Sequence, residues 1–155
     1  MNVEAWMTEA CELAAFKPRK ILFLCVQNSA RSIMAEAIAR HLAPPEVTVL
    51  SAGSNPAFLR HQAVQVLQEA GISTEGLHSK SVDQIDPTGV EAVITLCVEE
   101  VCPVFLGKVR RLHWGLSDPA RVEPEVAKLV AFRAVRDELM KRLTALFQGI
   151  RESAE

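Results

Sequence analysis

The stretch Lys20-Ile-Leu-Phe-Leu-Cys25-Val-Gln-Asn-Ser-Ala-Arg31-Ser32 constrains the fold of this chain more than any other. Its first part is a continuous apolar run, which is typical of a strand buried on both faces of a parallel sheet. Residues 31–42 have the pattern of a helix, which ends before Pro44-Pro45. The stretch therefore predicts a strand, a short loop and a helix, with a thiol, a guanidinium and a hydroxyl gathered at the junction.

Such a junction is suited to hold an oxyanion. The loop consists of Val26, Gln27, Asn28, Ser29 and Ala30. Its backbone N–H groups and the helix N-terminus carry partial positive charge, which attracts anions and should favour the thiolate of Cys25 near neutral pH. Arg31 can add a bidentate guanidinium fork, and Ser32 can donate to the thiolate or cap the helix. Free cysteines are often merely buried. A thiol placed inside an anion cradle instead indicates a nucleophile that acts on a tetrahedral oxyanion such as phosphate or arsenate.

Strand-like and helix-like segments alternate along the rest of the chain. We expect strands at 19–24, 46–51, 90–96 and 108–113, helices at 31–42, 60–70 and 124 to about 148, and a short helical piece at 82–85. This alternation predicts an α/β sandwich with a parallel sheet. Active sites of such folds lie at the carboxyl ends of strands. The residues just past the predicted strand ends should therefore converge on one edge: Cys25, Ser51, Cys97 and Trp114.

The sequence predicts a helix near each end of the chain. In residues 2–15 the apolar side chains recur near helical spacing, at Val3, Trp6 or Met7, Ala10 and Leu13. Cys11 lies in the same segment and is expected to be a packing residue. The spacing predicts an added N-terminal helix, docked or frayed, within an extension over 1–18 that precedes a single catalytic domain over 19–155. The closing helix is expected to bury one apolar side: Val126, Leu129, Val130, Val135, Leu139, Leu143 and Leu146.

Composition narrows the functional classes. The chain has 155 residues, 49% of them hydrophobic, and a formal net charge of −2, so we expect one domain and no nucleic-acid partner. No apolar run approaches the roughly 18 residues that a membrane span needs. The N-terminus lacks the basic segment of a secretory signal, so a cytoplasmic location is expected. For a chain with four cysteines in that reducing compartment, catalytic use of cysteine is a better expectation than a static disulfide framework.

Asp118-Pro119 follows the last predicted strand by one loop. An isolated Asp-Pro pair is usually only a turn. Thiolate attack on an oxyanion, however, requires a proton for the departing oxygen, and a carboxylic acid on a loop that faces the cradle can supply it. Because the chain already carries the cradle, we interpret Asp118 as the general acid.

Cys97 and Cys102 follow the third predicted strand in Cys97-Val-Glu-Glu-Val-Cys102. They could be packed thiols or half of a zinc site. Zinc would require more soft ligands at short spacing, and the histidines (His41, His61, His78 and His113) are scattered. A redox pair fits better, because Cys97 can reach Cys25 along the sheet edge and Cys102 can then resolve it by thiol–disulfide exchange.

Taken together, these motifs resemble the thioredoxin-coupled arsenate reductases of the low-molecular-weight tyrosine phosphatase superfamily. The resemblance runs over roughly residues 19–148 and rests on the following motifs: Cys25-Val-Gln-Asn-Ser-Ala-Arg-Ser32, Met34-Ala-Glu36, Ser51-Ala-Gly53, His78-Ser-Lys-Ser81, Val93-Ile-Thr-Leu-Cys97, Cys102-Pro103, His113-Trp-Gly115 and Asp118-Pro-Ala120. It implies a four-stranded parallel sheet flanked by helices. It also implies that Cys25 is the nucleophile, Arg31 and the loop amides the oxyanion clamp, Asp118 the acid, and Cys97 and Cys102 the redox relay.

The same resemblance implies an external thiol reductant such as thioredoxin, and no tightly bound cofactor. This chain departs from the family in three ways. Cys97 and Cys102 are closer together than is usual, and Ala30 replaces a second loop cysteine that many relatives carry. Some relatives bind potassium through residues that match Asn28, Glu36 and Ser51. The carboxylate that completes their site is Ser81 here, so potassium is left open.

Two other functions use the same cradle. A phosphatase would hydrolyse phosphate monoesters through a phosphocysteine on Cys25, with Arg31 and Asp118 in the same roles. Phosphotyrosine enzymes of the superfamily usually carry an aromatic residue after Asp-Pro, where this chain has Ala120, and the chain contains no tyrosine. An oxyanion sensor or phosphocysteine carrier without turnover would leave Asp118 and the cysteine pair unexplained.

Overall fold

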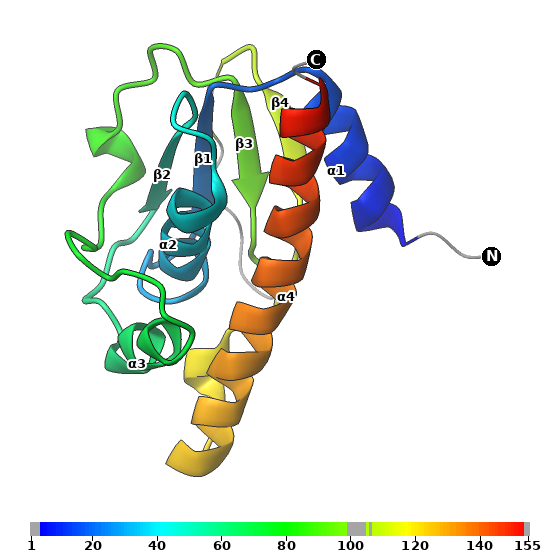
Figure 1. Cartoon of the computed structure of the whole chain (residues 1–155). Helices are drawn as coiled ribbons and strands as arrows, with labels where there is room; N and C mark the ends of the chain where they lie inside the picture. The colour runs from blue at the N-terminus through cyan, green and yellow to red at the C-terminus, as the bar shows by residue number, and fades with distance from the viewer. Residues whose placement is uncertain (1–3, 99–104, 106, 154–155) are drawn as a thin grey trace.

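The computed structural model describes residues 4–98, 105 and 107–153 (Figure 1). Four parallel strands form one sheet in the order β2-β1-β3-β4. The strands are β1 (Lys20–Cys25), β2 (Thr48–Gly53), β3 (Ala92–Thr95) and β4 (Arg110–His113). The α-helices are α1 (Ala5–Ala15), α2 (Arg31–Leu42), α3 (His61–Glu69) and α4 (Glu125–Ser153), with 3₁₀-helices at Val82–Gln84 and Pro119–Arg121. The predicted class, a four-stranded parallel sheet flanked by helices with an added N-terminal helix, is confirmed.

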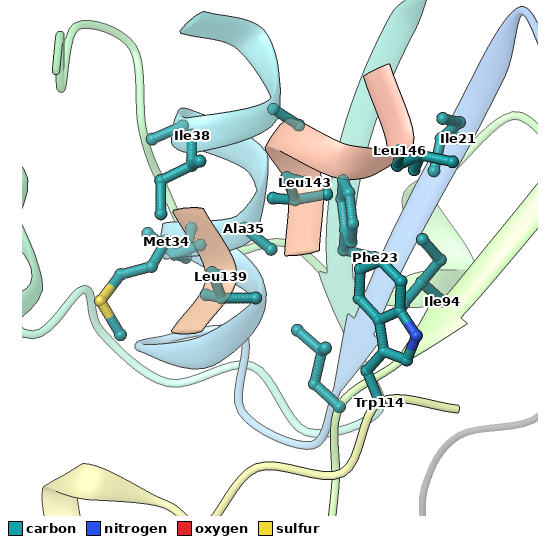
Figure 2. Packing of buried hydrophobic residues seen from close by; sticks show 14 of the residues in the cluster. Ile21, Phe23, Met34, Ala35, Ile38, Ile94, Trp114, Leu139, Leu143 and Leu146 are labelled. Carbon is teal, nitrogen blue, oxygen red and sulfur yellow. The ribbon is translucent and has the colours of Figure 1, made fainter. Parts of the chain in front are cut away.

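The central strand β1 is buried on both faces, as its unbroken apolar run predicts. Side chains alternate across a strand, so Ile21 and Phe23 face the helices while Leu22 and Leu24 face the other side. All four are fully buried. Figure 2 shows Phe23 against residues of α2 and α4, with Trp114 alongside. This packing fixes the direction of β1 and therefore the position of Cys25 at its end.

The two faces of the sheet are covered unequally. All four α-helices contribute side chains to the larger cluster, on the face that Figure 2 shows. The smaller cluster on the other face combines strand residues with Val82, Ile85 and Phe105. Within the described ranges, no helix has the length and apolar character needed to cross a membrane.

The N-terminal helix is docked. Trp6, Ala10 and Leu13 are buried as predicted, and the rings of Trp6 and Trp114 meet edge to face with their centroids 6.5 Å apart. A side chain at Gly149 would have its Cβ only 2.8 Å from that of Ala14, so glycine allows α1 to approach α4 closely. Cys11 is exposed, which makes its prediction as a packing residue wrong.

The closing helix differs from its prediction at its beginning. Val126 and Val130 were expected on the buried side, yet they are 77% and 58% exposed. Figure 1 shows the cause: the first turns of α4 extend past the end of the sheet, where fewer elements can cover them. From Phe132 onward the inward side is buried, and the helix continues past residue 148 to Ser153.

Candidate active site

The loop between β1 and α2 is shaped by Asn28. Its φ of +49° is the left-handed conformation that asparagine tolerates. The amide nitrogen Nδ2 donates to Ser32 Oγ at 2.7 Å and to Ser51 Oγ at 3.0 Å, while Oδ1 accepts from the backbone N–H of Lys80 at 2.8 Å. One fully buried side chain thus ties the loop to α2, to β2 and to the segment 78–81.

The loop's carbonyl groups turn away from the cradle. Those of Val26, Gln27 and Ser29 accept backbone N–H groups from residues 55–60 at 2.8–3.0 Å. The carbonyl of Asn28 accepts from Ser79 Oγ at 2.6 Å. In a trans peptide the C=O and the next N–H point in opposite directions. The outward carbonyls therefore aim the following N–H groups inward, where they can bind an anion.

Gly53, at the end of β2, is what lets that strand lie against the loop. A Cβ there would be 2.3 Å from Val26 O and 2.9 Å from the N of Asn28. Any side chain at Gly53 would push the loop out of place. The glycine of Ser51-Ala-Gly53 is therefore required by close backbone approach and not by a turn conformation.

Cys25 is a free thiol that is 2% exposed. Its sulfur lies 2.8 Å from Ser32 Oγ. Ser32 Oγ also accepts from Asn28 Nδ2 and keeps a hydrogen that it can donate to the sulfur. The hydroxyl of Ser32 and the inward N–H groups of the loop therefore surround a sulfur placed to act as a nucleophile.

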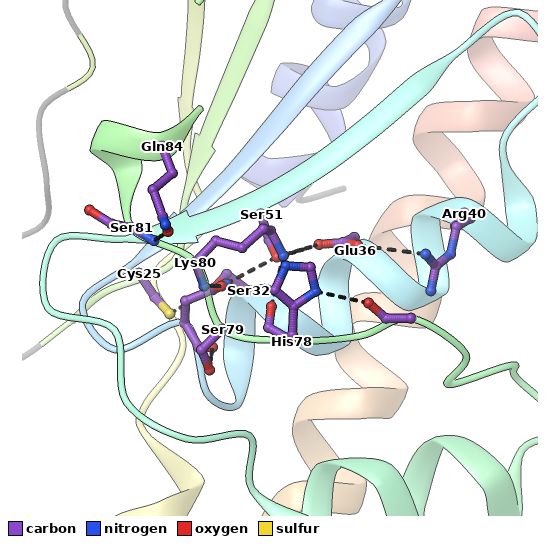
Figure 3. A network of polar contacts seen from close by, with 12 residues as sticks. Cys25, Ser32, Glu36, Arg40, Ser51, His78, Ser79, Lys80, Ser81 and Gln84 are labelled. Atoms are coloured by element: carbon purple, nitrogen blue, oxygen red, sulfur yellow. Dashed lines mark hydrogen bonds and ion pairs between the residues drawn. The ribbon is translucent and has the colours of Figure 1, made fainter. Parts of the chain in front are cut away.

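A second arm of the network leads from Asn28 to a buried carboxylate. Ser51 Oγ accepts from Asn28 and donates to Glu36 Oε1, as Figure 3 illustrates with Ser51, Glu36 and Lys80 side by side. Lys80 Nζ lies 3.2 Å from the same oxygen, and an Arg40 nitrogen lies 3.7 Å from Oε2. Glu36 is only 7% exposed, so two cations compensate its charge in the interior.

Arg31 and Asp118 are brought together as predicted. The Arg31 side chain is 5% exposed, donates to Leu116 O at 3.0 Å and has a nitrogen 3.9 Å from Asp118 Oδ2. Asp118 also has a local role, because its Oδ1 accepts from the N–H of Ala120 and caps the 3₁₀-helix that follows. A cavity of about 160 Å³ lies over these groups, lined by Val26, Gln27, Arg31, Arg60, Asp118, Ala120 and Arg121.

Cys97 lies at the same edge of the sheet. The N–H of Leu96 donates to Leu24 O at 3.0 Å, which places Cys97 beside the start of the oxyanion loop. Cys97 is disulfide-bonded and 1% exposed. Its predicted partner in the relay, Cys102, lies outside the described residues. Trp114, also expected at this edge, points into the core instead.

Sequence reasoning gave no chemistry to Ser79 and Lys80 of this site. For Arg60 the sequence allows either an exposed helix start, which it favours, or a positive charge near the mouth, and the structure places Arg60 in the cavity lining. The motif His78-Ser-Lys-Ser81 was a signal without an explanation, and the bonds from Ser79 and Lys80 to Asn28 provide one. Among the described residues, no group of three or more His, Cys, Asp or Glu side chains is arranged to hold a metal ion.

Comparison with known proteins adds three findings. The family model described as low molecular weight phosphotyrosine protein phosphatase matches residues 20–155. An arsenate reductase from Bacillus subtilis strain 168 is 39% identical over 126 residues, covering 79% of this chain and 91% of that protein. An arsenate reductase from Halalkalibacterium halodurans is 38% identical over 126 residues, with the same coverage of both chains.

Solved structures agree with the sequence relatives. A thioredoxin-dependent arsenate reductase from Corynebacterium glutamicum superimposes with a TM-score of 0.68 at 27% identity, covering 95% of this chain and 71% of that one. An arsenate reductase in the phosphate binding state gives a TM-score of 0.69 at 29% identity, covering 85% and 98%. An arginine phosphatase from Geobacillus stearothermophilus, at 22% identity and a TM-score of 0.67, shares the fold.

Proposed function

We propose that this chain, which belongs to the low molecular weight phosphotyrosine protein phosphatase family, reduces arsenate to arsenite. One observation carries the proposal: the buried free thiol of Cys25 lies 2.8 Å from Ser32 Oγ, next to a loop whose N–H groups face inward. A nucleophile in such a cradle suits a tetrahedral oxyanion. The names of the curated relatives point to arsenate as that oxyanion.

The first step forms a bond between sulfur and arsenic. Arsenate binds to the N–H groups of residues 26–32, and the Arg31 guanidinium holds its remaining oxygens. The Cys25 thiolate attacks arsenic while an oxygen departs on the opposite side. Asp118, which lines the same cavity as Arg31, gives its proton to that oxygen, which leaves as water. The product is an arsenate ester of the Cys25 thiol.

The second step transfers two electrons. The thiolate of Cys97 attacks the Cys25 sulfur, an S–S bond forms and the S–As bond breaks. Its electron pair remains on arsenic, which leaves as arsenite. Cys102 then attacks Cys97 and releases the Cys25 thiolate. An external dithiol such as thioredoxin reduces the Cys97–Cys102 disulfide. Because the cycle requires a reducing compartment, we propose that the protein acts in the cytoplasm.

The decisive assay is arsenate-dependent consumption of NADPH in the presence of thioredoxin and its reductase. We expect multiple turnovers with thioredoxin and few with glutathione alone. A parallel measurement with a chromogenic phosphate ester tests the phosphatase reaction. Ester hydrolysis without arsenate-dependent NADPH consumption would favour a phosphatase, and the absence of turnover in both assays would favour an oxyanion sensor.

The relay is tested by two serine variants. Cys97→Ser and Cys102→Ser should each stop multiple-turnover arsenate reduction but leave ester hydrolysis intact, because hydrolysis needs only the cradle and the acid. Peptide mapping after arsenate treatment should find a Cys25–Cys97 disulfide in Cys102→Ser and no disulfide in Cys97→Ser. Continued turnover by the double variant with thioredoxin alone would contradict the relay.

Phosphate ester hydrolysis is a secondary activity that the same groups can perform. Ala120 lines the cavity at the position where an aromatic residue would stack a phosphotyrosine ring. We therefore expect hydrolysis of small esters to be slow, with no preference for phosphotyrosine peptides. Competition by phosphate against arsenate would place both reactions at Cys25.

The sequence leaves open a potassium site near Asn28, Glu36 and Ser51. We propose that the Lys80 ammonium supplies the positive charge there in place of a potassium ion. The Lys80 ammonium lies 3.2 Å from Glu36 Oε1 and donates to His78 O at 2.8 Å, which supplies a cation to the carboxylate without a metal. Arsenate reduction should then have equal rates in potassium and sodium salts of the same ionic strength. Lys80→Met should make the rate respond to potassium. Several-fold activation of the unaltered protein by potassium would refute this.

A further inference from the structure

We infer that Arg60 is a second oxyanion-recognition residue, which captures the dianionic substrate at the mouth of the cradle. The inference deepens the proposed function, because it concerns the same site. It depends on the cavity next to Arg31 and Asp118, on the backbone hydrogen bond that ties Arg60 to the loop, and on the absence of a carboxylate partner for its guanidinium among the described residues.

The backbone of Arg60 is tied directly to the oxyanion loop. Its N–H donates to Ser29 O at 3.0 Å, the last of three such bonds from residues 55–60. Arg60 also occupies the N-cap position of α3, but its side chain makes no capping hydrogen bond. The backbone of Arg60 is therefore positioned by the loop, and its side chain is not used to cap α3.

The guanidinium of Arg60 differs from the other two at the mouth. Arg31 and Arg121 each have a nitrogen 3.9 Å from Asp118 Oδ2. Arg60 instead lies over the ring of Phe58, 5.5 Å from its centroid. Its Nε is buried and has no hydrogen-bond partner in the described part of the chain, where no carboxylate pairs with it either. A buried donor without an acceptor is unfavourable, and a bound anion would relieve it.

The charges around the cavity fit a dianion. Three guanidiniums and one carboxylate line a space of about 160 Å³, which leaves an excess of two positive charges. Arg31 faces the cradle itself, and Arg60 faces the same cavity from the loop that precedes α3. A cation placed beside the route of entry raises the local concentration of anions and strengthens their binding. It need not contribute to the chemical step, because it does not act on the departing oxygen.

The experiment measures phosphate binding without any redox chemistry. Cys25 is alkylated with iodoacetamide at increasing concentrations of inorganic phosphate, and the half-protecting concentration is recorded. In Arg60→Gln this concentration should rise about tenfold, the scale expected for losing one charged hydrogen bond, while alkylation without phosphate is unchanged. In the arsenate assay, kcat/KM should fall about tenfold while kcat stays within twofold.

The matched control is Arg110→Gln. Arg110 also lies over an aromatic ring, that of Phe16, but it begins β4 and therefore lies at the opposite edge of the sheet. Both variants remove one positive charge from a cation–π pair. Arg110→Gln should leave phosphate protection within twofold of the unaltered protein. Equal shifts in the two variants would indicate a general charge effect and would overturn the inference.

If Arg60→Gln has the same half-protecting phosphate concentration as the unaltered protein, the inference is also overturned. Arg60→Lys keeps the charge but not the planar fork and should give an intermediate shift, so it serves equally if Arg60→Gln does not fold. The readout is independent of the proposed function. If phosphate protection depends on Arg60 but arsenate is not reduced, only the assignment of the reaction fails.

Discussion

The two edges of this sheet differ in cavity volume and in the grouping of hydrogen-bond donors. The amino edge has the larger cavity, whereas the carboxyl edge has the convergent donors. At the amino edge lies a cavity of about 480 Å³, lined by Phe16, Pro18, Val90, Glu91, Lys108, Val109 and Arg110. At the carboxyl edge, the cavity over the cradle has about 160 Å³. The amino-edge charges are used structurally: Glu91 accepts the N–H of Arg19, and Arg110 lies over Phe16. Volume alone therefore does not identify the functional site.

The direction of the chain explains the difference. In a parallel sheet every strand ends at the same edge, and α2 begins there directly after β1 and its loop. The positive end of the helix, the loop N–H groups and the side chains that follow each strand consequently meet at the carboxyl edge. Among the described residues of the amino edge there is no such convergence of donors, so a ligand there would find space but little recognition.

The largest expected effect comes from removing the nucleophile. Cys25→Ser should lower arsenate reduction and ester hydrolysis by about 10⁴-fold or more, because no other group can form the covalent intermediate. Cys11→Ser is the matched control, since Cys11 is an exposed free thiol on α1. Steady-state rates of both reactions test this. Residual ester hydrolysis above about one per cent in Cys25→Ser would mean that the cradle does not use a thiol nucleophile.

A smaller effect is expected from the acid. Asp118→Asn should reduce kcat roughly 100-fold, the scale of general acid catalysis, while phosphate still protects Cys25 from alkylation. Asparagine keeps an oxygen that can accept the N–H of Ala120, so the 3₁₀-helix cap should persist. Single-turnover formation of the arsenic adduct measures the step itself. Wild-type kcat in this variant would assign the proton to another group.

Removal of the Ser32 hydroxyl should have a smaller effect than the substitution of Cys25 or Asp118. In Ser32→Ala the Cys25 sulfur loses its hydroxyl partner at 2.8 Å, so alkylation near pH 6 should slow about tenfold. Ser117→Ala is the control, because Ser117 is exposed and precedes Asp118 in the same loop. Alkylation rates across pH 5–9 distinguish lost nucleophile activation from general damage, which would slow the reaction equally at every pH. An unchanged rate at pH 6 contradicts the role given to Ser32.

The smallest effect should come from a substitution in the amino-edge cavity. Lys108→Gln changes a charged residue that lines the amino-edge cavity, and kcat/KM for arsenate should stay within twofold. The reason is that neither the cradle nor the sheet edge that carries it is touched. Phosphate protection of Cys25 should be unaltered as well. A drop of tenfold in either quantity would break the comparison and would assign the amino edge a part in the reaction.

Local sequence determined the strand, loop and helix around Cys25. The helix 31–42 was predicted with the bounds that α2 has, and asparagine at position 28 is compatible with the left-handed conformation found there. Apolar periodicity and backbone preferences act between neighbours in the chain, so they are readable without knowing the fold. The placement of Asp118 near Arg31 was also predictable, because parallel strands bring their ends to one edge.

Only the tertiary structure decided which distant surfaces meet. It paired Lys80 with Glu36, directed Arg60 to the mouth of the cradle and left Val126 exposed. The local signals for these placements do not decide them, because a lysine in a polar loop and an arginine before a helix are most readily interpreted as solvated residues until another segment packs against them. The sequence by itself determined the nucleophile and its cradle, because both are built within one short stretch. The charges that surround and tune that cradle come from other segments, whose positions depend on how the whole chain packs.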